Sequence, residues 1–141
     1  MFKNFLKKKK EVESDKKNIS IIALLVHAAK IDENYTDMEK KIIKKALIDF
    51  TNEDSEQTDE LIKQAEKKEE EQNQIVEFTR EIKKYSMASR LKIIEIIWKI
   101  VYSDGTNNAY ESNLIRRICG LLYISDKDNG IIKTKVQNLL K

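Results

Sequence analysis

The chain contains no proline and only 3 glycines among its 141 residues. A chain of this length with average composition carries about 10 glycines and about 7 prolines. Because both residue types form turns and break helices, their scarcity predicts long helices joined by short connections. It argues against collagen-like, linker-rich and many-turned β architectures. The length suits one domain with a core of its own, and the single cysteine cannot form an internal disulfide.

Apolar residues recur at helical spacing along most of the chain. The pattern predicts seven helices, at about residues 18–31, 37–50, from 55, around 75–82, 89–103, 109–122 and from 126. The fifth is the most apolar, so we expect it in the core. A charged stretch, residues 67–71, separates the third helix from the fourth, although nothing in the sequence excludes one long helix there. Its three glutamates, Glu69 to Glu71, are expected on a solvated face.

The positive charge is concentrated at the N-terminus. The total is +3, but five lysines give the first ten residues a charge of +5, and residues 11–141 hold 22 basic and 24 acidic side chains. A nucleic-acid-binding domain is expected to carry its basic face on the folded body. We therefore expect a basic tail, residues 1–17, preceding one domain, residues 18–141, and no specific nucleic-acid partner.

The basic tail suggests contact with an anionic membrane. Its apolar side chains would enter the lipid interface while the lysines face the headgroups, at about 1 kcal/mol per lysine. The residues concerned are Phe2, Phe5, Leu6, Lys7, Lys8, Lys9 and Lys10. A solvated, frayed terminus is the alternative. The order of charge and apolar residues does not match a secretory signal, and no apolar stretch reaches the roughly 18 residues of a membrane span. We expect a cytoplasmic protein, with peripheral contact to the inner face of the membrane as an open alternative.

An internal repeat relates two parts of the chain. A shift of 72 residues aligns residues 21–50 with residues 93–122 without gaps, and apolar positions mostly meet apolar positions. Asp32 then meets Asp104, and Glu39 meets Glu111. Each half is an apolar helix, a short turn and an amphipathic helix. The expected fold is therefore all-α, a compact bundle of about seven helices built from two pseudo-symmetric helix–turn–helix halves.

The duplicated acids have two interpretations. Glu39 and Glu111 lie three residues after Thr36 and Asn108, the spacing at which a glutamate closes a capping box. Asp32 and Asp104 follow the negative end of an apolar helix, where a carboxylate is unfavourable by roughly 0.3–1 kcal/mol. Turn amides, a lysine or a metal ion would compensate. Pooled carboxylates suit Ca²⁺, Mg²⁺ or Mn²⁺, so the candidate metal ligands are Asp32, Glu39, Asp104 and Glu111. The spacing does not match an EF-hand.

The duplicated turn resembles the tellurite-resistance TerB family. In that family an apolar helix ends in Ala-x-x-Asp-Gly, and the next helix opens with Glu. The matching segments here are Ala28-Ala29-Lys30-Ile31-Asp32 and Val101-Tyr102-Ser103-Asp104-Gly105, followed by Glu39 and Glu111. The resemblance covers about residues 18–125. It departs from the family at Glu33, where glycine is usual.

The resemblance implies two helical halves packed about a pseudo-twofold axis, with an acidic surface proposed in the family to hold metal. Carboxylates repel the tellurite anion, so a bound divalent cation or a scaffold for partner proteins of a stress-response or membrane-associated system fits better. The alternative is a structural adaptor that the basic tail recruits to membrane or nucleic acid. We expect no enzyme, because His27 has no apparent nucleophile beside it and Cys119 falls on an apolar stripe.

Overall fold

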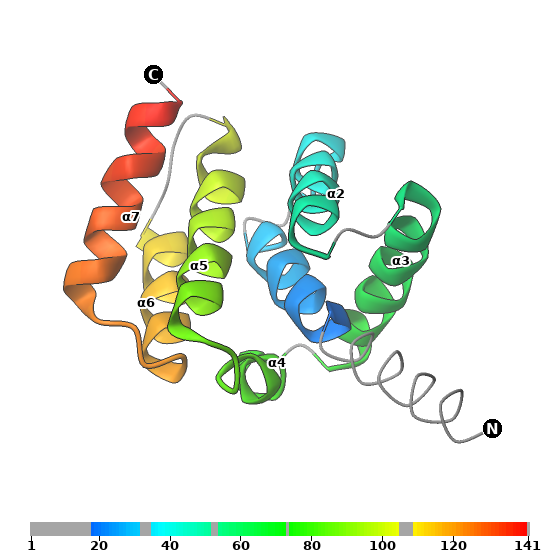
Figure 1. The fold of residues 1–141 in the computed structure, drawn as a ribbon, viewed down its shortest axis with the longest axis horizontal. Coiled ribbons are helices and arrows are strands. Elements are labelled where there is room, and N and C mark those ends of the chain that lie inside the picture. Colours follow the sequence, from blue (N-terminus) through cyan, green and yellow to red (C-terminus); the bar gives the residue numbers. More distant parts are fainter. Residues whose placement is uncertain (1–17, 32–34, 52–53, 73, 105–108, 141) are drawn as a thin grey trace.

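The computed structural model describes residues 18–31, 35–51, 54–72, 74–104 and 109–140, and every regular element in these segments is helical. Residues 18–29 form the first helix, called helix 18–29 here. The others are α2 (Asp37–Thr51), α3 (Ser55–Glu71), α4 (Ile75–Ile82), α5 (Met87–Val101), the 3-10 helix η1 (Tyr102–Asp104), α6 (Ala109–Leu121) and α7 (Asp126–Leu139) (Figure 1). The predicted all-α class is confirmed for the described residues. The pseudo-symmetry of the two halves stays a prediction.

Short polar side chains start three of these helices. Asp54 accepts a hydrogen bond from the amide of Gln57 at 2.8 Å, and Ser86 accepts one from the amide of Ser89 at 3.2 Å. Ser125 accepts one from the amide of Asp128 at 3.1 Å. Each bond satisfies an amide that has no partner within its own helix, which explains why the helices begin where they do without proline.

Helix α5 lies at the centre of the packing. Eight of its 15 residues are buried, and α2, α6 and α7 all pack against it. Figure 1 shows α5 and helix 18–29 in the middle of the molecule, with α6 and α7 on one side and α2 and α3 on the other. Trp98 is 2% exposed, and its indole N–H donates to Asn129 of α7 at 2.9 Å. The core position expected for the helix at residues 89–103 is therefore confirmed.

The charged stretch of residues 67–71 belongs to α3, which continues to Glu71. The chain leaves the helix at Gln72 and restarts at Gln74, the N-cap of α4, so α3 and α4 are separate helices. The expectation of a fully solvated face was wrong for Glu69, which is 5% exposed. Glu69 continues the buried stripe of α3, four residues after Ala65.

None of the helices in the described part of the chain is long and apolar enough to cross a bilayer.

The packing of α4 predicts a sharp contrast between two positions on that helix. Phe78 is fully buried, whereas Val76 is 46% exposed. We expect Phe78→Ala to lower the free energy of unfolding by about 3–5 kcal/mol, because it removes buried contacts and leaves a cavity. Val76→Ala is the matched control and should change it by less than about 0.5 kcal/mol. Urea titrations followed by circular dichroism measure both, and equal losses would contradict this packing.

Candidate functional site

The first acidic turn ends in a complete capping box. The amide of Thr36 donates to Oε1 of Glu39 at 2.9 Å, and the amide of Glu39 donates to the Thr36 hydroxyl at 3.1 Å. That hydroxyl donates in turn to the same carboxylate oxygen at 3.0 Å. Glu39 is 6% exposed, and its charge lies at the positive end of α2. The capping interpretation is therefore confirmed for Glu39.

The second acidic turn starts from η1, which tightens the end of α5. The Ser103 hydroxyl donates to the carbonyl of Ile100 at 2.7 Å, one way in which a terminal helix carbonyl is satisfied. Glu111 opens α6 and is 5% exposed. Burial raises the pKa of the Tyr102 phenol, and the nearby charge of the Glu111 carboxylate raises it further. A hydrogen bond with Gln137 partly offsets this rise.

The carboxylates of Glu66, Glu39 and Glu69 lie near Tyr35 at the first turn. Burial raises the pKa of its phenol first, and the nearby charges of Glu66, Glu39 and Glu69 raise it further. Its hydroxyl is buried beside the Glu66 carboxylate. Lys40 lies over the ring, 4.9 Å from its centroid, and forms an ion pair with Glu66 at 3.4 Å. The first turn is thus an oxygen-rich surface with lysine countercharges.

Glu69 of α3 connects the same region to helix 18–29. Its two carboxylate oxygens contact Nδ1 of His27 at 3.2 Å and Nζ of Lys30 at 2.8 Å. A buried carboxylate is costly unless it is paired, and these two side chains supply the pairing. Sequence reasoning missed Glu66 and Glu69 as neighbours of the turn. The signal for Glu69 was its place on the Leu61–Ala65 stripe, at helical spacing.

Of the four predicted metal ligands, Glu39 and Glu111 are described with their side chains. Asp32 lies outside the described residues, and for Asp104 only the backbone, at the end of η1, is described. The predicted membrane-contact residues also lie outside the described residues, namely Phe2, Phe5, Leu6, Lys7, Lys8, Lys9 and Lys10. Within the described segments, no cluster of three or more His, Cys, Asp or Glu side chains is placed to hold a metal ion.

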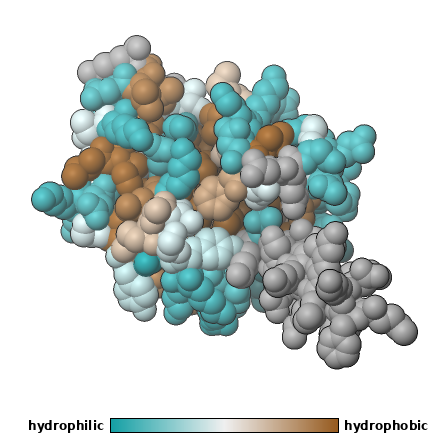
Figure 2. All heavy atoms as spheres, in the orientation of Figure 1, coloured by the Kyte–Doolittle hydropathy of each residue, from teal (hydrophilic) through white to brown (hydrophobic). Residues whose placement is uncertain are grey.

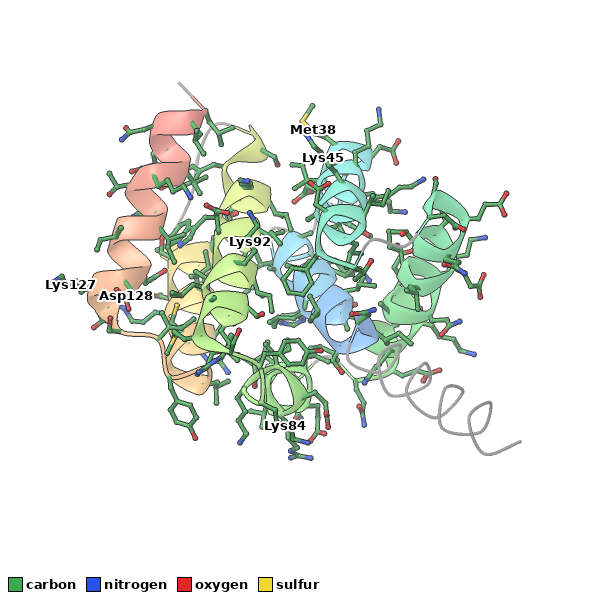
Figure 3. All side chains as sticks on the ribbon, in the orientation of Figure 1. Met38, Lys45, Lys84, Lys92, Lys127 and Asp128 are labelled. Carbon is green, nitrogen blue, oxygen red and sulfur yellow. The ribbon has the colours of Figure 1, made fainter. Side chains whose placement is uncertain are left out.

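The start of α2 and η1 border one groove, which we call the α2–α5–α7 groove. Its volume is about 800 Å³. Met38, the residue before Glu39, and Ser103, the residue before Asp104, both line it. The remaining lining residues are Ile42, Lys45, Ala46 and Asp49 of α2, Lys92, Ile96 and Lys99 of α5, Tyr102 of η1, and 136–140 at the end of α7. Figure 3 shows Met38 and Lys45 on α2, and Lys92 on the neighbouring α5.

A cluster of lysines surrounds one buried carboxylate next to this groove. Glu95 of α5 is 6% exposed. Lys135 of α7 approaches it at 2.6 Å, Lys92 at 3.0 Å and Lys99 at 4.0 Å. Hydrogen bonding with Lys135 has the largest effect on the pKa of Glu95. Together with Lys92 it outweighs burial, which acts to raise the pKa, and lowers the pKa to about 2. Glu95 thereby joins α5 to the end of α7 that forms one wall of the groove.

The two residues considered for redox or nucleophilic chemistry are engaged in the structure. Cys119 is 1% exposed, and burial raises the pKa of its thiol to about 12, so the reactive thiolate is disfavoured. The expected burial of Cys119 is therefore confirmed. His27 contacts Glu69 and packs near Phe78, with ring centroids 6.4 Å apart.

Comparison with known families gives one match. The sequence profile of the family described as "Tellurite resistance protein TerB" matches residues 18–134. No curated protein and no solved structure matches the chain significantly.

The Glu95 cluster predicts a pH-dependent contribution to stability. A carboxyl whose pKa is lower in the folded than in the unfolded state stabilises the fold above its unfolded pKa, and the contribution is lost as the pH falls towards the folded value. We expect Glu95→Gln to lower the free energy of unfolding by about 1 kcal/mol at pH 7, since the three lysines stay partly solvated. The deficit should shrink between about pH 4.5 and about 2.

Urea titrations at pH 7 and pH 2.5 measure this difference between the variant and the wild type. Glu77→Gln is the matched control, because Glu77 forms an exposed ion pair with Arg80 on α4 and should contribute little at either pH. An equal deficit of Glu95→Gln at both pH values would show that the lost charge is not the cause.

Proposed function

The chain belongs to the TerB family, as the match over residues 18–134 shows, and on this premise we propose that it is a non-enzymatic domain that binds a divalent cation through its two acidic turns. In this proposal the cation-loaded domain acts as a scaffold for other proteins of a stress-response or membrane-associated system. Direct binding of tellurite is not part of the proposal, because carboxylates repel an anion.

One observation carries the proposal. Glu39 and Glu111 occupy matching positions of the 72-residue repeat, and both are buried, at 6% and 5% exposure. Removing a carboxylate from water is costly, and this chain does so twice at the first turn of a helix. A capping box explains the position of Glu39. It does not explain why an aspartate, Asp32 or Asp104, also precedes each of these helices.

The donor chemistry fits a hard cation. The groups at the first turn offer oxygen ligands: the Glu39 carboxylate, the Glu66 carboxylate of α3 that lies beside it, and the buried Tyr35 hydroxyl. Oxygen ligands suit Ca²⁺, Mg²⁺ and Mn²⁺, whereas zinc prefers histidine and cysteine. The ligands would be Asp32, Glu39, Asp104 and Glu111. Such a cation would offset the carboxylate charge that the turns concentrate.

The proposal of a non-enzymatic role is supported by the state of the reactive side chains. The chain has one histidine and one cysteine. The histidine is paired with Glu69, and the cysteine is buried with a raised pKa. Histidine and cysteine are two of the side chains that general acid–base and nucleophilic catalysis use most often, and here neither is free to act on a substrate.

A thermal-shift series with CaCl₂, MgCl₂ and MnCl₂ against a chelator tests the proposal. A cation at 100 times its Kd stabilises the fold by about 2.7 kcal/mol, which corresponds to a rise of several degrees in Tm for at least one ion. We expect Asp32→Asn, Asp104→Asn and Glu39→Gln each to reduce this rise. Glu39→Gln keeps an oxygen that accepts the Thr36 hydrogen bonds, so the cap is largely preserved.

Glu81→Gln is the control for a general loss of negative charge. Glu81 forms an exposed pair with Lys84, which Figure 3 places at the opposite edge of the molecule from Met38. Its response to the ions should match that of the wild type. If none of the three ions raises the Tm, or if Glu81→Gln reduces the rise as much as Asp104→Asn, the proposed cation site is wrong.

A further inference from the structure

The α2–α5–α7 groove has a partly apolar lining, and no described segment of the chain fills it. Helix α2 buries Glu39, Ile43 and Leu47 on one side and presents Met38, Ile42 and Ala46 to the groove. Three of the large apolar side chains that are most exposed among the described residues lie on its walls: Met38 at 60%, Leu139 at 61% and Leu140 at 54%. Figure 2 shows apolar side chains reaching the surface on this face, flanked by hydrophilic ones. Clustered exposed apolar side chains mark interaction surfaces.

The dimensions of the groove fit a helix. Its lining on α2 runs from Met38 to Asp49, and on the opposite wall from Lys92 of α5 to Ser103 of η1. At 1.5 Å per residue, each wall is about 15 Å long, which is about three helical turns. On both helices the lining residues recur at three- or four-residue spacing, so each presents one continuous stripe. An amphipathic helix binds to such a groove through its own apolar stripe.

The charges around the groove indicate the charge of the helix that would bind there. Among the described residues, Lys45, Lys92 and Lys99 line it against a single carboxylate, Asp49. Glu95, which lies next to it, is shared by three lysines, so the cluster keeps a positive charge. Lys45 makes no ion pair with a described residue. A positive rim attracts an acidic partner and disfavours a basic one. The chain's own N-terminal segment, with a charge of +5 over residues 1–10, is therefore the wrong occupant.

From these observations we propose that the α2–α5–α7 groove binds an acidic amphipathic helix of a partner protein, with its apolar stripe on Met38 and Ile96 and its carboxylates facing Lys45, Lys92 and Lys99. This interaction is separate from the proposed cation site, because it uses lysines and apolar side chains rather than the acids of the turns. It supplies a contact surface for the scaffold role.

Fluorescence anisotropy with a labelled peptide tests the proposal on the full chain in chelator, so the result does not depend on a bound cation. The probe is a 14-residue helix-forming peptide with leucines at helical spacing and glutamates on its flanks. A second peptide carries lysine in place of each glutamate. We expect saturable binding of the acidic peptide in the micromolar range, and about tenfold weaker binding of the basic one.

Two matched pairs of variants locate the binding site. Lys45→Glu, in the groove, should weaken binding of the acidic peptide about fivefold, whereas Lys127→Glu, at the far end of α7 (Figure 3), should change it by less than about twofold. Met38→Ala should weaken binding about fivefold. Ile131→Ala is its control, because Ile131 is similarly exposed at 57% but does not line the groove.

Several outcomes would overturn the proposal. These are no saturable binding of the acidic peptide, equal binding of the two peptides, or equal effects of Lys45→Glu and Lys127→Glu. A dimer in sedimentation that Met38→Ala dissociates would assign the groove to a second copy of this chain. Binding of phosphatidylserine vesicles that Met38→Ala abolishes would assign it to a membrane surface. Either result would also overturn the proposal, and neither bears on the cation site.

Discussion

The burial of α5 is the constraint on which the other features depend. The helix carries seven buried apolar side chains and one buried carboxylate, Glu95. Burying the apolar part is favourable at roughly 25 cal/mol per Å², but the carboxylate requires partners, and lysines on α5 and α7 supply them. Because α2, α6 and α7 all pack on this one helix, both acidic turns and the groove are built on the same support.

The amino-acid sequence was sufficient for the helices and for much of the core, because helical periodicity and caps such as Ser125 are local signals. It was not sufficient to predict that Glu69 is buried. A run of three glutamates resembles a solvated face, and the partners that bury Glu69, His27 and Lys30, are 42 and 39 residues away in sequence. The groove could not be predicted from the sequence either, because helical periodicity identifies Ile42 as an apolar position of a helix without showing which neighbouring helices leave it uncovered.

The acidic turns and the groove have opposite chemistry although they adjoin. Glu39 is buried in a capping box, and the next residue towards the N-terminus, Met38, is exposed on the groove wall. Successive residues of a helix point about 100° apart, so a single turn of α2 serves both surfaces. In the two proposals made above, a cation and an acidic helix would bind on adjoining sites, and the lysines of the groove would separate the two sets of negative charge.

If the two acidic turns act together on one cation, as proposed, paramagnetic Mn²⁺ should broaden the amide signals of both. Sub-stoichiometric Mn²⁺ is added to ¹⁵N-labelled protein, and the loss of each amide signal is recorded. We expect amides at the start of α2 and at the start of α6 to broaden first and to a similar extent, and excess Ca²⁺ or Mg²⁺ to restore them. Broadening confined to one turn, or spread over the exposed carboxylates of α3 and α4, would contradict the proposal.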